Sequence, residues 1–245
     1  MRNLIVTGVD GCDGGKDAAA LAVALAAGTD AEVLLTGVWQ ETLLPLPLLL
    51  GPQMRPLEEI ERMLLTTRAE LAPRGITRPL SDLSPARALR RTAREEHADL
   101  IVLGSTHAPR GHVRAGQCAR QVIHDAPCAV AIAATGVHHE PFAVRRILVG
   151  IDGGVESDAA LTAARGLART LGAQLNVLTA GEVRLGDPDT ELALAAAAAD
   201  LVVVGSRHWG RRSRVVIGSI AERLMRDAPC SLMVVPRPAE EASDR

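Results

Sequence analysis

The sequence predicts an α/β protein made of two related halves, each an open parallel sheet flanked by helices. Sequence blocks repeat in the same order, short apolar runs alternate with Ala- and Leu-rich segments of helical period, and the apolar runs carry no polar alternation. Leu201–Val204, for example, is apolar at every position, as a strand covered by helices on both faces requires. This alternation favours parallel strands joined by crossover helices.

The internal repeat is visible in two long blocks. Asp99–Ser105 returns as Asp200–Ser206, an offset of 101 residues, and Asp125–Cys128 returns as Asp227–Cys230, an offset of 102. The first half therefore has one residue fewer between these two landmarks.

The halves also differ in length before these blocks. Val9-Asp10-Gly11 returns as Ile151-Asp152-Gly153, which places the two aspartates 142 residues apart, and the second half therefore lacks about 41 residues of the first. A gap of that size corresponds to one helix and one strand, whose removal from the sheet edge leaves a shorter sheet. We assign residues 1–136 to a complete first domain and 144–237 to a shortened second domain, with 134–144 as the linker.

The short apolar runs predict strands, and the Ala- and Leu-rich segments of helical period predict helices. In the first half we expect strands near 3–9, 32–38, 76–81, 99–104 and 128–133, with helices near 16–27, 57–72, 85–97 and 116–125. In the second half we expect strands near 146–151, 174–179, 200–205 and 230–235, with helices near 157–171, 189–199 and 218–227.

The helix near 157–171 shows how such a segment is identified. Ser157 is a candidate N-cap, an apolar stripe runs from Ala160 to Leu171, and Gly172 can adopt the left-handed conformation that ends a helix. Leu43–Pro52 cannot be a regular helix because Pro45 and Pro47 lack amide donors. This apolar loop is a lid over a pocket, a contact patch for a partner, or a segment packed on its own domain.

Composition excludes several classes of function. A formal net charge of −2, with no Tyr, one Phe and two Trp, provides neither a basic field nor a stacking platform for nucleic acid. No apolar stretch approaches the roughly 20 residues that span a bilayer. Charged residues interrupt the apolar start of the chain, so it lacks the continuous apolar run of a secretory signal. The four cysteines show no disulfide or zinc spacing. We expect a cytoplasmic protein without nucleic-acid or membrane partners.

Glycines mark a candidate anion-binding loop. Gly205 follows a strand, and Gly218-Ser219 opens a helix after a fixed spacing, where backbone amides can approach a phosphate, although turn geometry alone also explains such glycines. The Walker, GxGxxG, GxSxG and HExxH motifs are absent. His107 and His112 lack a third ligand nearby in sequence, so we predict no metal site.

Taken in order, these blocks make the whole chain resemble a tandem universal stress protein. The resemblance rests on the two Asp-Gly strand ends, on Ser84–Leu89 leading into Ala98–Ser105, on the glycine loops, and on the repeated Asp-Ala-Pro-Cys blocks. It implies a five-stranded nucleotide-binding fold, ATP as the ligand with or without Mg²⁺, and pairing of the halves through their last strands near 128–133 and 230–235. Cys12 and Cys118 would lie at the pocket, as thiols open to oxidation.

The resemblance also implies a set of ligand-binding residues. The family's phosphate loop reads Gly, two residues, Gly, nine residues, Gly, then Ser or Thr. His107 and His208 stand at the second glycine, where imidazole either blocks phosphate or donates to it. The first-half loop is one residue short, so we expect the second-half loop to be the better site. The implied binding residues are Asp10, Val38, Gly104, His107, Gly116 and Gln117 in the first half, and Asp152, Gly205, His208, Gly218 and Ser219 in the second, where Ala180 approximates Val38.

Asp10 and Asp152 have an alternative role, since Asp before Gly commonly caps the turn after a strand. The function we expect is stress-response regulation by binding ATP without catalysis, in a chain that also forms a homodimer. The alternatives are a nucleotide-free interaction or scaffold protein and a weak ATPase, although no residue stands out as a base.

Overall fold

A computed structural model of the chain describes residues 3–39, 56–151, 153–179, 195–208, 215–216 and 219–236. The first half contains β1 (Leu4–Gly8), α1 (Asp13–Ala26), β2 (Glu32–Trp39), α2 (Leu57–Leu71), β3 (Ile76–Ser81), α3 (Pro85–Glu95), β4 (Leu100–Gly104), α4 (Gln117–His124) and β5 (Ala129–Ala133). The second half contains β6 (Arg146–Ile151), α5 (Val155–Leu171), β7 (Gln174–Thr179), β8 (Leu201–Gly205), β9 (Arg207–His208), β10 (Val215–Val216), α7 (Ser219–Asp227) and β11 (Ser231–Val235).

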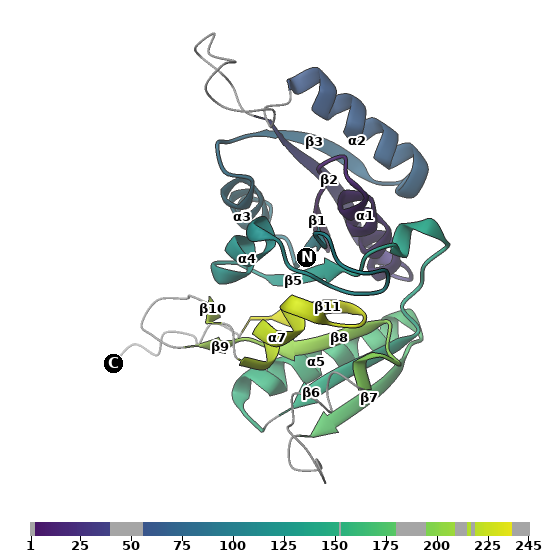
Figure 1. Cartoon of the computed structure of the whole chain (residues 1–245), viewed down its shortest axis with the longest axis vertical. Helices are drawn as coiled ribbons and strands as arrows, with labels where there is room; N and C mark the ends of the chain where they lie inside the picture. The colour runs from purple at the N-terminus through teal and green to yellow at the C-terminus, as the bar shows by residue number, and fades with distance from the viewer. Residues whose placement is uncertain are drawn as a thin grey trace.

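The two halves form one continuous nine-stranded sheet, in the order β3-β2-β1-β4-β5-β11-β8-β6-β7 (Figure 1). The expectation of two separate sheets was therefore wrong. The last strands pair as expected, and they do so antiparallel, with Val130 opposite Val234 and Ile132 opposite Leu232. Each last strand would otherwise be an exposed edge, and their pairing satisfies both sets of backbone groups. The other strand pairs of this sheet are parallel.

The shortened half keeps the inner part of the sheet. Its order β7-β6-β8-β11 repeats β2-β1-β4-β5, and among the described residues it has no counterpart of β3. The deletion therefore falls at the sheet edge, where a strand can be lost without interrupting the pairing of the others. The two short strands β9 and β10 pair only with each other in the described part.

Two apolar layers cover the two faces of the sheet. On one face, Val6 and Ile101 pack with α3, α4 and α7. On the other, Ile5 and Val102 pack with α1, α2 and α5. Successive residues of one strand thus enter opposite layers, which explains why the strand sequences are apolar at every position.

Most boundaries of the elements lie within two residues of the predicted ones, but the start of α1 and the N-cap of α5 differ. α1 begins at Asp13, three residues before the expected start, and α5 begins at Val155, with Gly154 rather than Ser157 as its N-cap. The Ser157 hydroxyl donates to the Gly154 carbonyl at 2.7 Å, inside the first turn. Gly172 ends α5 in the left-handed conformation, with φ of 63°.

The segment that joins the halves is held against α1. Asp17 of α1 is fully buried, and its carboxylate accepts bonds from the Gly136 amide at 2.9 Å and the His138 amide at 3.0 Å. The ring of His138 donates through Nδ1 to the same carboxylate at 2.5 Å. The linker is therefore an integral part of the first half.

The apolar loop 43–52 and most of the predicted helix 189–199 lie outside the described residues.

Thr7 in β1 provides a test of the core. It is 0% exposed, and its hydroxyl has no hydrogen-bond partner among the described residues. Because an unpaired buried hydroxyl costs free energy, Thr7→Val is expected to stabilise the fold by about 1 kcal/mol. Urea unfolding should show a higher midpoint with an unchanged slope.

The matched control is Thr36→Val on the adjacent strand β2. The Thr36 hydroxyl is also buried, but it donates to the Thr7 carbonyl at 2.9 Å, so its removal should lower the midpoint. A lower midpoint in Thr7→Val would contradict the prediction.

In the described part of the chain, no helix combines the length and the apolarity needed to cross a bilayer.

Candidate functional site

A cavity of about 560 Å³ lies at the carboxyl ends of β1 and β4. The two neighbours of β1 in the sheet are β2 and β4, so the chain runs outward from β1 first to one side and then to the other. The cavity therefore lies at the point where the strand order switches. Ligands of open α/β sheets bind at such points. Its walls are formed by Gly8, Val9, Asp10, Cys12, Gly14, Gly15, Thr36, Val38, Ile60, Pro85, Leu89, Leu103, Gly104, Ser105, Thr106, Gly116, Gln117, Cys118 and Ala119.

Five of the six residues expected in the first half are on these walls, namely Asp10, Val38, Gly104, Gly116 and Gln117. Asp10 also fills its alternative role, since its Oδ1 accepts the Cys12 amide at 3.0 Å in the turn after β1. The remaining residue, His107, is exposed and is not part of the lining.

Two helices begin at the cavity. Cys12 is the N-cap of α1 and Gly116 the N-cap of α4, and neither makes a side-chain capping bond. The first turns of both helices contribute to the lining through Gly14 and Gln117, among others. Because the first amides of a helix lack intrahelical acceptors and carry the positive end of the helix dipole, this arrangement favours an anionic group in the cavity.

Glycines allow these helices to approach the strand ends. A Cβ on Gly104 would collide with the carbonyl of Gly14, and one on Gly14 would lie 2.5 Å from the Ser105 carbonyl oxygen. A Cβ on Gly15 would lie 2.8 Å from the Asp10 amide nitrogen. Gly104 is thus needed for the contact between β4 and α1. Gly14 and Gly15 were not among the expected site residues, although the Gly-Gly pair shortly after the first predicted strand was a usable signal.

The loop from Ser105 to Gly116 closes the cavity on one side. It is tied together by the Thr106 amide, which donates to the Arg114 carbonyl at 2.9 Å. The Ser105 hydroxyl accepts the Arg114 amide at 3.2 Å and donates to the Ala133 carbonyl at 2.6 Å. Within this loop His107 has φ of 49°, a left-handed conformation that glycine adopts most readily.

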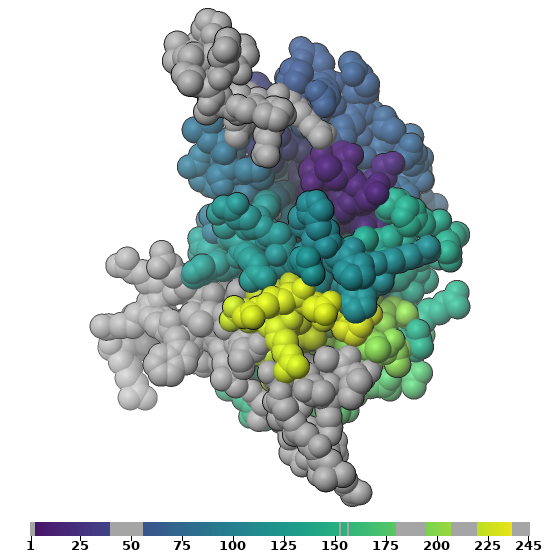
Figure 2. Space-filling model, in the orientation of Figure 1, coloured from purple at the N-terminus to yellow at the C-terminus, as the bar shows by residue number. Residues whose placement is uncertain are grey.

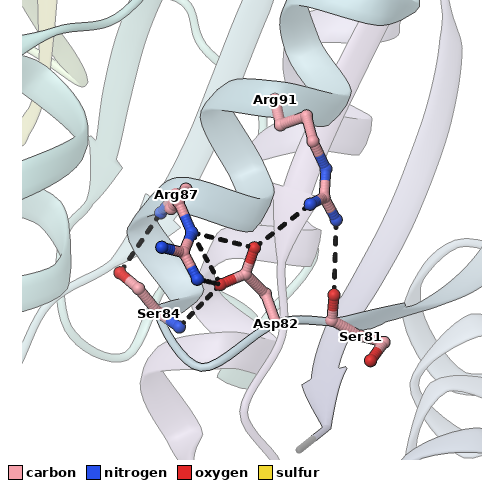
Figure 3. A network of polar contacts seen from close by, with 5 residues as sticks. All are labelled: Ser81, Asp82, Ser84, Arg87 and Arg91. Carbon is pink, nitrogen blue, oxygen red and sulfur yellow. Dashed lines mark hydrogen bonds and ion pairs between the residues drawn. The ribbon is translucent and has the colours of Figure 1, made fainter.

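A network of polar contacts fixes the start of α3, which supplies Pro85 and Leu89 to the cavity wall (Figure 3). The carboxylate of Asp82 is 2% exposed. Its Oδ1 accepts three bonds, from Arg87 Nη2 at 2.6 Å, from Arg87 Nε at 2.9 Å and from the Ser84 amide at 2.9 Å. Arg91 Nη1 lies 3.3 Å from the other oxygen. The network joins the end of β3 to the first turns of α3, and sequence analysis did not identify it because Asp82 has no distinctive local pattern.

These contacts make the fold sensitive to acid. The Arg87 side-chain bond, followed by the Ser84 amide and the charges of Arg87 and Arg91, holds the pKa of Asp82 below its ordinary value of 3.8, against the opposing effect of burial. A carboxyl whose pKa is depressed by folding stabilises the protein above its ordinary pKa, and this contribution is lost as the pH falls through the folded value.

We therefore expect the urea midpoint of Asp82→Asn to be lower than that of the parent at pH 7. The difference between the two midpoints should shrink as the pH drops below about 4. Urea midpoints at several pH values between about 2 and 7 measure the effect. Asp125→Asn is the control, because its carboxylate is half-exposed and lies 3.5 Å from Arg90. A constant difference between parent and Asp82→Asn at every pH would contradict the role of the Asp82 charge.

Two thiols lie on the cavity wall, at the positions expected from the sequence. Cys12 is exposed, whereas burial raises the pKa of Cys118 to about 11. Burial also raises the pKa values of Cys128 and Cys230, in each case to about 12. Near neutral pH these three thiols are therefore protonated and poor nucleophiles.

The expected site in the second half is described only in part. Gly205 ends β8, the backbone of His208 belongs to β9, and Ser219 begins α7. β6 and β8 are neighbours, with Val149 opposite Val203, so their carboxyl ends meet as those of β1 and β4 do. Asp152, Gly218, Ala180 and Trp209 lie outside the described residues.

The described residues contain no group of three His, Cys, Asp or Glu side chains that could hold a metal ion. His112 Nδ1 instead donates to Asp227 Oδ1 of the second half at 2.7 Å.

Comparison with known proteins identifies the family. The sequence profile of the Universal stress protein family matches residues 1–134 and 179–236. The chain belongs to the universal stress protein family. The two matched segments correspond to the complete first half and the later part of the second. No curated protein matches the chain.

The same fold is found in a solved structure. A universal stress protein from Archaeoglobus fulgidus DSM 4304 matches with a TM-score of 0.65 and 16% identity, covering 97% of this chain and 99% of that one. A family member from Burkholderia pseudomallei matches at 26% identity over 54% of this chain and 96% of its own, with a TM-score of 0.42. A universal stress protein in complex with cAMP matches at 22% identity over 55% and 98% of the two chains, also with a TM-score of 0.42.

Proposed function

We propose that this universal stress protein binds an adenine nucleotide in the cavity of its first half and acts by binding rather than by catalysis. The observation that carries the proposal is the cavity itself, placed at the switch point of the strand order and between the first turns of α1 and α4. Its volume of about 560 Å³ falls within the roughly 300–1,000 Å³ of small-molecule sites.

The charge of the lining favours a ligand with few phosphates. The described lining contains Asp10 and no Lys, Arg or His, so an anion would be held by backbone amides, helix dipoles and neutral donors such as Thr106 and Gln117. A single phosphate suits such a site better than the several charges of a triphosphate. Cyclic AMP, which is bound in one related structure, and AMP are therefore better candidates than ATP, with or without Mg²⁺.

A binding role fits the titratable groups of the cavity. Asp10 accepts the Cys12 amide, and the pKa of Cys118 is raised to about 11, so neither resembles a base or nucleophile poised for ATP hydrolysis. One observation favours the alternative of a nucleotide-free interaction protein. In the loop from Ser105 to Gly116, the Val113 and Ala115 amides donate to the Ala228 and Met225 carbonyls. These amides are therefore not available to a phosphate.

Calorimetry on nucleotide-free protein tests the proposal. Parent protein would be titrated with cAMP, AMP and Mg-ATP, beside Val38→Trp, which fills the cavity, and Gly218→Glu, which changes the second-half loop. Val177→Trp, on the exposed edge strand β7, controls for the added indole. We expect Val38→Trp to lose binding and the other two variants to keep it.

The reverse pattern, with binding lost only in Gly218→Glu, would place the site in the second half. No binding to the folded parent would favour the nucleotide-free interaction protein.

Alkylation of the unmodified chain gives a second measurement. Cys12 is exposed on the cavity wall, while the other three thiols have raised pKa values, so iodoacetamide near neutral pH should react mainly at Cys12. A bound nucleotide should slow this reaction several-fold. An unchanged rate at a saturating concentration would mean that the ligand lies elsewhere.

A further inference from the structure

The loop that closes the cavity belongs to the first half but is held by the second. Its two ends, Ser105 with Thr106 and Gly116, line the cavity. Between them, the Val113 amide donates to the Ala228 carbonyl and the Ala115 amide donates to the Met225 carbonyl, both at 2.7 Å.

A side-chain contact reinforces these two backbone bonds. His112 Nδ1 lies 2.7 Å from Asp227 Oδ1. The loop thus makes three contacts, through His112, Val113 and Ala115, with the end of α7 and the residue that follows it. Figure 2 shows the yellow surface of the α7 region directly against the teal surface of the first half. Val113, Met225 and Ala228 are each 0% exposed, so water does not compete for these bonds.

The same loop is bonded to the end of β5, next to the joint between the halves. The Gly111 amide donates to the Thr135 carbonyl at 2.8 Å, and the Thr135 amide donates to the His112 carbonyl at 2.9 Å. Just before Thr135, the Ala134 amide donates to Ser231 Oγ of β11 at 3.1 Å. The position of the loop over the cavity therefore depends on how α7 and β11 pack against the first half.

We propose that the second half is a regulatory partner of the first-half nucleotide site, acting through the contacts of residues 112–115 with residues 225–228. The inference rests on the proposed nucleotide site in the first half. A change in the packing of α7 moves the acceptors of Val113 and Ala115 and thereby the cavity wall formed by Thr106 and Gly116. By linkage, a nucleotide that prefers the closed loop must stabilise the packing of α7 to the same extent.

The first test compares full-length variants of residues that do not line the cavity. Asp227→Ala removes the contact with His112 and is expected to weaken nucleotide binding about two- to five-fold, as the loss of a partly exposed hydrogen bond allows. Arg226→Ala is the matched control, because this neighbouring side chain bonds only to Glu222 within α7 among the contacts of the described residues. It should bind nucleotide as the parent does.

Hydrogen exchange gives a readout that does not depend on a substitution. With saturating cAMP, the amides of Val113 and Ala115 should exchange more slowly, and so should the amides of α7 and β11, which are remote from the cavity lining. Protection confined to the first half, with equal affinity in parent and Asp227→Ala, would overturn the regulatory role while leaving the nucleotide site intact. Failure of the parent to bind any nucleotide would overturn the proposed function, and this inference with it.

Discussion

Replacing Gly104 with alanine is expected to destabilise the protein by about 3 kcal/mol and to abolish binding in the cavity. The new Cβ would collide with the carbonyl of Gly14, which is backbone in the first turn of α1 and cannot rotate away as a side chain could. Relief requires α1 to move from the end of β4. That movement would also displace Gly15 and the turn held by Asp10, which line the cavity.

Chemical denaturation and nucleotide titration of Gly104→Ala measure the two effects. Gly166→Ala is the control, since this glycine lies inside α5 and its Cβ would meet no atom of the described residues within 4 Å beyond its chain neighbours and its own helix backbone. Alanine there should stabilise the helix by about 1 kcal/mol. If Gly104→Ala kept parental stability, the close contact between β4 and α1 would not be a requirement of the fold.

Removing the carboxylate of Asp17 is the second large change. Asp17→Ala is expected to lower the free energy of unfolding by about 3 kcal/mol, because it leaves the Gly136 and His138 amides and the His138 ring without their acceptor. Since Asp17 is fully buried, water cannot readily replace the lost bonds. The linker should then separate from α1, and the amides of Gly136 and His138 should exchange faster.

Asp13→Ala is the matched control on the same helix. The side chain of Asp13 is 76% exposed and its Oδ1 is 3.9 Å from His138 Nε2, a contact from which little stability is expected. Equal midpoints for Asp17→Ala and Asp13→Ala in urea would show that the linker does not depend on the buried carboxylate.

The sequence by itself determined the repeat, the number of strands in the main sheet and the edge at which the second half is shortened. These features are local, because apolar period and repeated blocks can be read without knowing which residues meet in space. Where local propensity conflicted with tertiary packing, the prediction failed. The start of α1 was predicted near residue 16. Gly14 and Gly15, which have low helix propensity, nevertheless belong to the helix, and its contact with the strand ends leaves no room for a Cβ at either position.

The tertiary structure alone decided the direction and register in which the last strands pair, and which distant residues hold the cavity wall. Sequence period gives no register between β5 and β11, and their antiparallel pairing turns two predicted sheets into one. Asp17 accepts bonds from residues 119 and 121 positions away, and the cavity loop finds its acceptors more than 100 positions along the chain. Such contacts depend on the folded path of the chain, because isolated Asp, His or Ala residues carry no local pattern that identifies their distant partners.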